Sequence, residues 1–234
     1  MTETSFASRL AAVEERIRSA ADRSGRPVAS ITLVAVSKKF SAAAMVEAYS
    51  CGVRHFGENY VQEFAGKKPE LAGLNDAKFH LIGHLQSNKA NQACDLFQVI
   101  HTIDSPKLLH RLDSAARERN IPLDALVEIK LSDEGTKSGA DASDLPRLLD
   151  AAAGCRNVKV VGLMTMPPWS EDAELSRPYF RRLAELAWQN GLTQLSMGMS
   201  NDFEVAIDEG ATLIRVGTAL FGKRPKPPEG ISSD

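Results

Sequence analysis

The chain has 234 residues, of which 43% are hydrophobic and 25% charged, and its formal net charge is −2. This composition is typical of one globular domain that buries a substantial core. A charge so close to zero provides no long-range attraction to nucleic acid or to an anionic membrane surface, so we expect neither as a partner. No window approaches 18 uncharged apolar residues, so we expect no segment that spans a membrane.

The N-terminal segment is amphipathic, because Phe6, Leu10, Val13 and Ile17 recur at helical spacing among charged residues. This pattern predicts a helix rather than a signal peptide. The three cysteines are isolated and odd in number, which favours a reducing compartment. We therefore expect a cytoplasmic protein.

Short apolar runs alternate with helical patterns along the rest of the chain. The runs that predict strands are residues 31–36, 54–56, 79–82, 99–103, 126–129, 158–163, 194–197 and 213–216. Eight such strands, each followed by a helix, predict an α/β fold in which a single parallel sheet closes into a (β/α)₈ TIM-type barrel. An open doubly wound sheet would need a glycine-rich phosphate loop after the first strand, and Ser37-Lys38-Lys39 stands there instead.

The domain organisation follows from the same pattern. We expect one barrel domain over residues 1–222, with the extra helix at its start. Residues 223–234 contain three prolines and end in Ser-Ser-Asp, which predicts a loose tail.

Two lysines follow the first predicted strand, where a barrel of this kind has its working face. Strand alternation places Lys38 and Lys39 on opposite sides, so only one can point into the barrel mouth. Partial loss of water there lowers the pKa of an amine and makes it able to form a Schiff base with an aldehyde-bearing cofactor. Two solvated loop lysines are the alternative interpretation.

Asn59 follows the second predicted strand, which we expect Gly57 to close. Its amide offers both a donor and an acceptor near the mouth, where a phenolic oxygen of a ligand could bind. Capping of the next helix is an equally good interpretation of Asn59.

The segment after the seventh predicted strand contains Gly198, Ser200 and Asn201. Glycine permits close approach of a ligand to the backbone, and we expect Ser200 or Asn201 to begin a helix whose free amides could bind phosphate. Asp202 and Glu204 would bring negative charge near such an anion, so an empty capped helix start remains the alternative.

The last predicted strand contains Arg215 and is followed by Gly217 and Thr218. Burying the guanidinium is costly unless it meets a partner. Loops after the seventh and eighth strands recurrently form a phosphate site in these barrels. Two phosphate-competent loops, together with a lysine after the first strand, therefore form a more specific pattern than any one of them.

Several motifs together resemble one known family, that of the pyridoxal phosphate homeostasis proteins. They are Val36-Ser37-Lys38, residues 55–63, 85–89, 101–104, 195–200 and 214–222. The similarity covers nearly the whole chain. It implies the barrel of the alanine racemase N-terminal domain without the second domain of the racemase, and hence a monomer.

The resemblance also assigns roles to particular residues. It implies that Lys38 holds pyridoxal 5′-phosphate as a Schiff base, with Lys39 as the outward neighbour. It implies that Ser200, Gly217 and Thr218 bind the phosphate. The same resemblance places Arg215 near the pyridine nitrogen and Asn59 near the face of the cofactor.

The function implied is reversible binding, buffering and delivery of pyridoxal phosphate, with effects on amino-acid and keto-acid pools and little or no catalysis. Recipients would be apo enzymes that depend on this cofactor. An arginine at the ring nitrogen weakens the electron sink that catalysis needs, and a second base opposite the lysine is not evident. A pyridoxal-dependent racemase or aldolase is the alternative, and a phosphate-binding barrel enzyme without Schiff-base chemistry is a third interpretation.

Other polar residues receive plainer interpretations. His80 and His84 are four residues apart but flank a strand end, so we expect no metal site. His101 and Asp104 could support the site from behind, although Asp104 or Ser105 could equally cap a helix. Lys137 lies in a polar loop after the fifth strand, where a solvated lysine is the default expectation.

Overall fold

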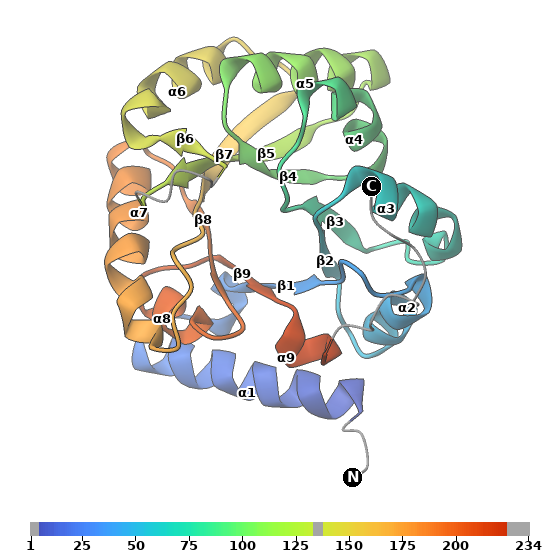
Figure 1. Cartoon of the computed structure of the whole chain (residues 1–234), viewed down its shortest axis with the longest axis vertical. Coiled ribbons are helices and arrows are strands. Elements are labelled where there is room, and N and C mark those ends of the chain that lie inside the picture. Colours follow the sequence, from blue (N-terminus) through green and yellow to red (C-terminus); the bar gives the residue numbers. More distant parts are fainter. Residues whose placement is uncertain (1–4, 133–137, 224–234) are drawn as a thin grey trace, which may run out of the picture.

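The computed structural model describes residues 5–132 and 138–223. Within these residues, eight parallel strands close into a barrel that helices surround (Figure 1). The strand order is β4-β3-β2-β1-β9-β8-β7-β5, and pairing of β4 with β5 closes the ring. The predicted (β/α)₈ barrel is confirmed.

The strands of the barrel are short, as the apolar runs predicted. They are β1 (Thr32–Val36), β2 (His55–Glu58), β3 (Lys78–Leu81), β4 (Val99–Ile103), β5 (Leu123–Lys130), β7 (Val158–Met164), β8 (Gln194–Met199) and β9 (Leu213–Val216). A two-residue strand that was not predicted, β6 (Ala140–Asp141), pairs with the end of β5.

Helices follow the strands and cover the outside of the barrel. They are α1 (Phe6–Arg23), α2 (Ala42–Ser50), α3 (Val61–Lys67), α4 (Ala90–Leu96), α5 (Pro106–Arg119), α6 (Leu145–Ala153), α7 (Arg177–Gln189), α8 (Phe203–Asp208) and α9 (Thr218–Phe221). None of these described helices is both long and apolar enough to cross a membrane.

Two strands continue two residues past their predicted last residue. The second strand continues through Gly57 to Glu58 instead of closing at the glycine, because the ladder to β3 extends to the pair Glu58–Leu81. Likewise β8 continues to Met199, which pairs with Arg215 across a local shift in register. The first extension ends at a fully buried carboxylate, Glu58, and the second brings the chain to Met199, just before Ser200.

The main apolar core lies between the sheet and its helices, as in other barrels of this class. A second, smaller cluster fills the inside of the barrel and includes Val34, Leu126 and Met164. The barrel interior is therefore packed with side chains, and ligand access is confined to its ends.

The extra N-terminal helix lies outside the barrel, where α1 crosses α8 and α9 (Figure 1). Phe6, Leu10, Val13 and Ile17 are all buried beneath it, as the helical spacing predicted. Its contacts therefore lie behind the two loops that follow β8 and β9.

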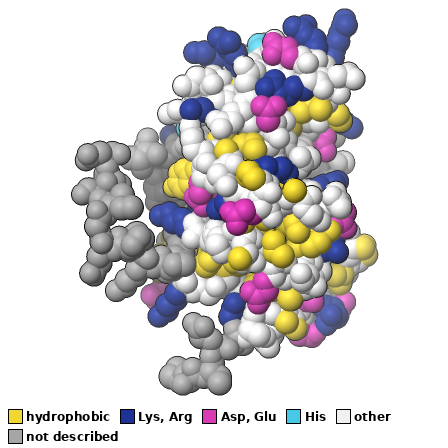
Figure 2. Space-filling model, turned by 90° about the vertical axis from the view of Figure 1, so that its right-hand side faces the viewer, with side chains coloured by type: hydrophobic (Ala, Val, Ile, Leu, Met, Phe, Trp, Pro, Cys, Tyr) yellow, Lys and Arg dark blue, Asp and Glu magenta, His cyan; other side chains and the backbone are white. Residues whose placement is uncertain are grey.

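The surface carries charges of both signs. Figure 2, which views the molecule from the side of α2 and α3, shows Lys and Arg interspersed with Asp and Glu and with apolar patches. This mixture agrees with the net charge of −2.

Candidate functional site

An open cavity of about 330 Å³ lies at the carboxyl ends of the strands. Its volume is within the range of small-molecule sites in proteins. Six residues that the sequence singled out all line it, namely Lys38, Asn59, Ser200, Arg215, Gly217 and Thr218. The structure therefore brings every predicted site residue to one place.

A tight turn after β1 presents Lys38 to the cavity. Lys39 is exposed and has a positive φ of 66°, and its backbone N–H donates to Glu63 Oε1 at 2.5 Å. Strand alternation was therefore the wrong reason for the opposite directions of the two lysines, because β1 ends at Val36 and the turn separates them.

A buried ion pair lies directly behind this turn. Ser37 Oγ donates to Glu58 Oε1 at 2.8 Å, and Lys67 Nζ from α3 approaches the same oxygen at 3.0 Å. Burial raises the pKa of Glu58, and the charge and hydrogen bond of Lys67 oppose that shift. Lys67 also contacts Glu63 at 2.7 Å. Together these groups hold the turn between β1 and α2 in place.

Asn59 stands just past the end of β2 with its side chain in the cavity wall. Its Oδ1 atom is buried and has no hydrogen-bond partner among the described residues. A buried oxygen without a donor is costly unless a ligand or water supplies one. Of the two interpretations of Asn59, helix capping has no support, because α3 has no side-chain cap.

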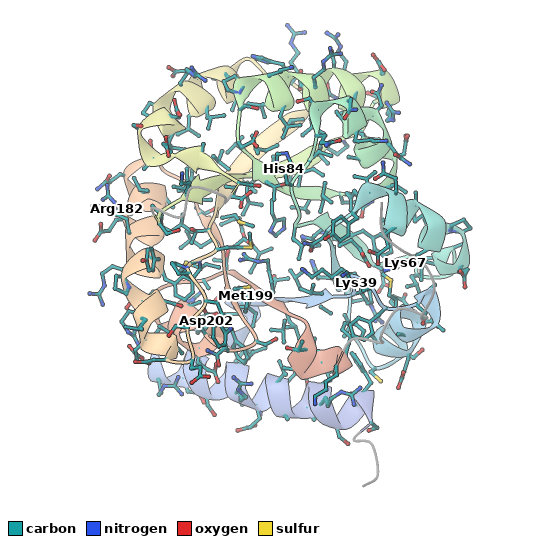
Figure 3. The ribbon with its side chains drawn as sticks, viewed as in Figure 1. Lys39, Lys67, His84, Arg182, Met199 and Asp202 are labelled. Atoms are coloured by element: carbon teal, nitrogen blue, oxygen red, sulfur yellow. The ribbon has the colours of Figure 1, made fainter. Side chains whose placement is uncertain are left out.

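The turn after β8 is held by Asp202. Its Oδ1 accepts from the backbone N–H of Met199 at 2.7 Å, and its Oδ2 accepts from Ser176 Oγ at 2.9 Å. The helix begins at Phe203, later than predicted, because Asp202 occupies the N-cap position. Figure 3 shows Met199 and Asp202 near α8, across the mouth from Lys39 and Lys67, while Arg182 points outward from α7.

The loops after β8 and β9 meet at the cavity. The backbone N–H of Gly217 donates to Ser200 Oγ at 3.3 Å, and Thr218 lies beside them in the lining. Hydroxyl groups and a backbone amide thus gather in one corner, a donor set that suits an anion such as phosphate.

Arg215 forms part of the cavity wall although it is only 3% exposed. Its Nη1 donates to Ser196 Oγ at 2.6 Å and its Nη2 donates to the backbone oxygen of Thr165 at 2.9 Å. Burial lowers the pKa of Arg215 to about 10, and the charges of Asp202 and Glu128 oppose the shift. The guanidinium is therefore charged at neutral pH.

Sequence reasoning missed the partners of Arg215. Ser196 and Thr165 contact it, and beyond Ser196 a row of buried histidines begins with His101. The available signal was that three consecutive predicted strands each contain one histidine, namely His55, His80 and His101.

Other predicted positions lie apart from this cluster. His84 is half-exposed with Nδ1 at 3.5 Å from Asp104 Oδ2, and Ser105 rather than Asp104 caps α5. Lys137 and residues 224–234, nearly all of the predicted tail, lie outside the described residues. In the described ranges no three His, Cys, Asp or Glu side chains gather as a metal site would require.

Comparison with known proteins shows extensive similarity. The family model for the alanine racemase N-terminal domain matches residues 8–225. The chain is 43% identical over 222 residues to the pyridoxal phosphate homeostasis protein of Aquifex aeolicus, covering 92% of this chain and 97% of that protein. It is 40% identical over 226 residues to the protein of that name from Escherichia coli K12, covering 94% and 97%.

Solved structures give the same relationship. PipY from Synechococcus elongatus, solved with PLP bound, is 42% identical with a TM-score of 0.81 over 93% of this chain and 100% of that chain. An alanine racemase from Clostridium difficile is 12% identical, with a TM-score of 0.67 over 91% of this chain and 58% of that chain. At that low identity the racemase shares the fold alone.

Proposed function

This chain belongs to the pyridoxal phosphate homeostasis protein family, and from that premise we propose that it binds pyridoxal 5′-phosphate reversibly and holds it for delivery. The observation that carries the proposal is the single cavity that joins Lys38 to Arg215 and to the hydroxyl cluster of Ser200 and Thr218. An amine, a phosphate-competent corner and a buried cation are the groups that this cofactor needs.

The residues present fit the cofactor. Pyridoxal phosphate supplies an aldehyde that reacts with a primary amine and a pyridine ring that can accept electrons. Lys38 provides the amine at the end of β1. The Asn59 Oδ1 atom, which has no partner among the described residues, offers an acceptor for a polar group of the ligand. The hydroxyls of Ser200 and Thr218 offer donors to the phosphate, and so does the Gly217 N–H once it turns from Ser200 Oγ to the ligand.

Two features favour reversible binding of the cofactor over catalysis. A cationic Arg215 beside the ring nitrogen disfavours protonation of that nitrogen and so weakens the ring as an electron acceptor. Racemisation also needs a second base facing the lysine, and none of Tyr49, Tyr60 and Tyr179 lines the cavity. The recipients we propose are apo enzymes that use the same cofactor.

Borohydride reduction of the loaded protein, followed by peptide mapping, tests the binding role. We expect the reduced adduct on Lys38, its loss in Lys38→Ala, and normal labelling of Lys39→Ala as the matched control. Labelling of Lys39, or equal labelling of Lys38→Ala and the parent, would refute the assignment.

Exchange of the α-hydrogen of alanine in deuterated water tests the proposed lack of catalysis. We expect no exchange above that of free cofactor at equal concentration. Rapid exchange that depends on Lys38 would instead establish the racemase or aldolase alternative.

A further inference from the structure

A continuous row of hydrogen bonds crosses the inside of the barrel and ends at Arg215. His55 Nδ1 lies 2.9 Å from His80 Nε2, and His80 Nδ1 lies 2.9 Å from His101 Nε2. His101 Nδ1 lies 2.8 Å from Ser196 Oγ, which accepts from Arg215 Nη1 at 2.6 Å. Five strands, β2, β3, β4, β8 and β9, each contribute one member of this histidine row.

The direction of every bond in the histidine row follows from Arg215. A guanidinium only donates, so Ser196 Oγ accepts from it. Ser196 is fully buried, and its own proton meets an acceptor among its described partners only if it is donated to His101 Nδ1. A neutral imidazole that accepts at Nδ1 carries its proton at Nε2. His101 therefore donates to His80 Nδ1, and His80 donates to His55 Nδ1.

The surroundings keep the two inner rings neutral. His80 and His101 are buried, and burial lowers the pKa of His80 to about 3 and that of His101 well below its usual value. The charges that face the row are Arg215 at its inner end and Lys78 beside His55, and both oppose a further positive charge. His55 is the partly exposed end of the row.

We infer that His101, supported by His80, is a positioning residue that acts on the cofactor through Arg215. The histidine row, in which every hydrogen bond is donated away from Arg215, orients the guanidinium in the cavity wall and stabilises its charge. Each neutral ring presents its accepting nitrogen toward Arg215, so the ring dipoles have their negative ends toward the cation. The effect on the cofactor rests on the proposed function: Arg215, held in one orientation beside the pyridine ring, would keep the ring nitrogen unprotonated.

Histidine ¹⁵N NMR of the protein without cofactor tests the row directly, because Nδ1 and Nε2 shifts distinguish the tautomers. We expect His55, His80 and His101 to be neutral with the proton on Nε2 at pH 7. A proton on Nδ1 of His80 or His101, or a charged ring at either position, would overturn the inference. This measurement is independent of whether the protein binds pyridoxal phosphate.

Two substitutions at His101 test the consequence for the cofactor. His101→Phe removes the acceptor for Ser196, and we expect about tenfold weaker cofactor binding and a shifted pH midpoint of the bound cofactor's absorbance. His101→Asn returns an acceptor near the position of Nδ1 and should restore both values toward those of the parent. His110→Phe, on the exposed face of α5, is the matched control and should change neither.

The outcomes separate the two claims. Parent-like binding and an unchanged absorbance midpoint in folded His101→Phe would overturn the positioning role while leaving the proposed function intact. Failure of the parent itself to take up the cofactor would instead refute the proposed function. Should His101→Phe not fold, the tautomers and the His101→Asn titration decide the inference.

Discussion

Arg16 donates a hydrogen bond of 3.3 Å to the backbone oxygen of Ser200, although its helix, α1, lies outside the barrel. The same guanidinium pairs with Glu204 at 2.6 Å and lies 4.3 Å from the ring centre of Phe203. Arg9 of the same helix donates to the backbone oxygen of Leu220, beyond the β9 loop. The extra helix thus supports both loops that we propose to bind phosphate.

Arg16 does not line the cavity, yet Arg16→Met should weaken cofactor binding. Without the hydrogen bond to Ser200 the turn after β8 is less firmly held. We expect the affinity for the cofactor to fall about threefold to tenfold, which corresponds to the net free energy of one such hydrogen bond. Stability should fall by at most about 1 kcal/mol, because the pair with Glu204 is partly exposed. Arg18→Met, which breaks an exposed pair on the same helix, is the control. Equal affinities in a cofactor titration of both variants would contradict this role for α1.

Lys67→Met should destabilise the protein strongly. It leaves the fully buried Glu58 without its counter-charge, and breaking a buried pair from one side costs about 3 kcal/mol. Urea unfolding at pH 8, where the Glu58 carboxyl is most fully ionised, should show this loss in the free energy of unfolding. Adding Glu58→Gln to Lys67→Met should recover most of that free energy.

The control for Lys67 is Arg182→Met, which breaks the exposed pair with Glu185. We expect a change within about 0.5 kcal/mol there. A loss at Lys67 no larger than at Arg182 would show that the ion pair behind Lys38 contributes little.

Gly198→Ala should lower the free energy of unfolding by more than backbone strain alone would. Gly198 has a φ of +88°, and a Cβ there would lie 2.5 Å from Ala206 Cβ and 2.9 Å from Phe203 Cα. We expect a loss of about 3 kcal/mol together with weaker cofactor binding, because the turn that carries Ser200 must move. Gly191, with a φ of +67° and open space around it, isolates the backbone strain. Gly191→Ala should cost about 1 kcal/mol and leave binding unchanged, whereas equal losses would exclude the steric explanation.

The fold and the location of the site were predictable because both depend on local order along the chain. Apolar runs of strand length alternate with helical patterns, and a barrel carries its site after the strands. That rule alone placed Lys38, Asn59 and Thr218 at one mouth, where the structure has them. Which atoms these residues bind is a prediction that the chemical tests decide.

The supporting contacts were not predictable, because they join residues that only the closed barrel brings together. Ser196 and His101 are 95 residues apart, and their contact depends on β4 and β8 lying across the barrel from each other. A strand that closed at Gly57 would leave Glu58 outside the sheet, whereas Glu58 pairs with Leu81 of β3. Its ion pair with Lys67 depends on how far the ladder between β2 and β3 continues.

Trp169 should report cofactor binding. It lines the cavity while 75% exposed, and Trp188 on α7, 82% exposed, lies outside the lining. The bound cofactor absorbs where indole emits, so a ring at the cavity wall should lose its fluorescence when the cofactor binds. We expect Trp169→Phe to abolish most of the quenching during a cofactor titration and Trp188→Phe to retain it. Quenching that depends on Trp188 instead would place the cofactor elsewhere.

Glu128 should make the protein less stable as the pH rises. Burial raises the pKa of this carboxyl to about 7, against the opposing charge of Arg215. Between about pH 4.5 and pH 7 the folded state therefore holds a proton that the unfolded state has released, and stability falls with increasing pH. Above pH 7 the full cost is present, on the order of 3 kcal/mol.

Glu128→Gln removes this cost and keeps the shape of the side chain. Its free energy of unfolding, relative to that of the parent without cofactor, should grow from pH 4.5 to pH 8 by roughly the same amount. Exposed Glu70→Gln is the control and should track the parent at both pH values. A constant difference between Glu128→Gln and the parent across this range would mean that the carboxyl ionises as readily in the folded as in the unfolded chain, in which case it would add a full negative charge opposite Arg215 at neutral pH.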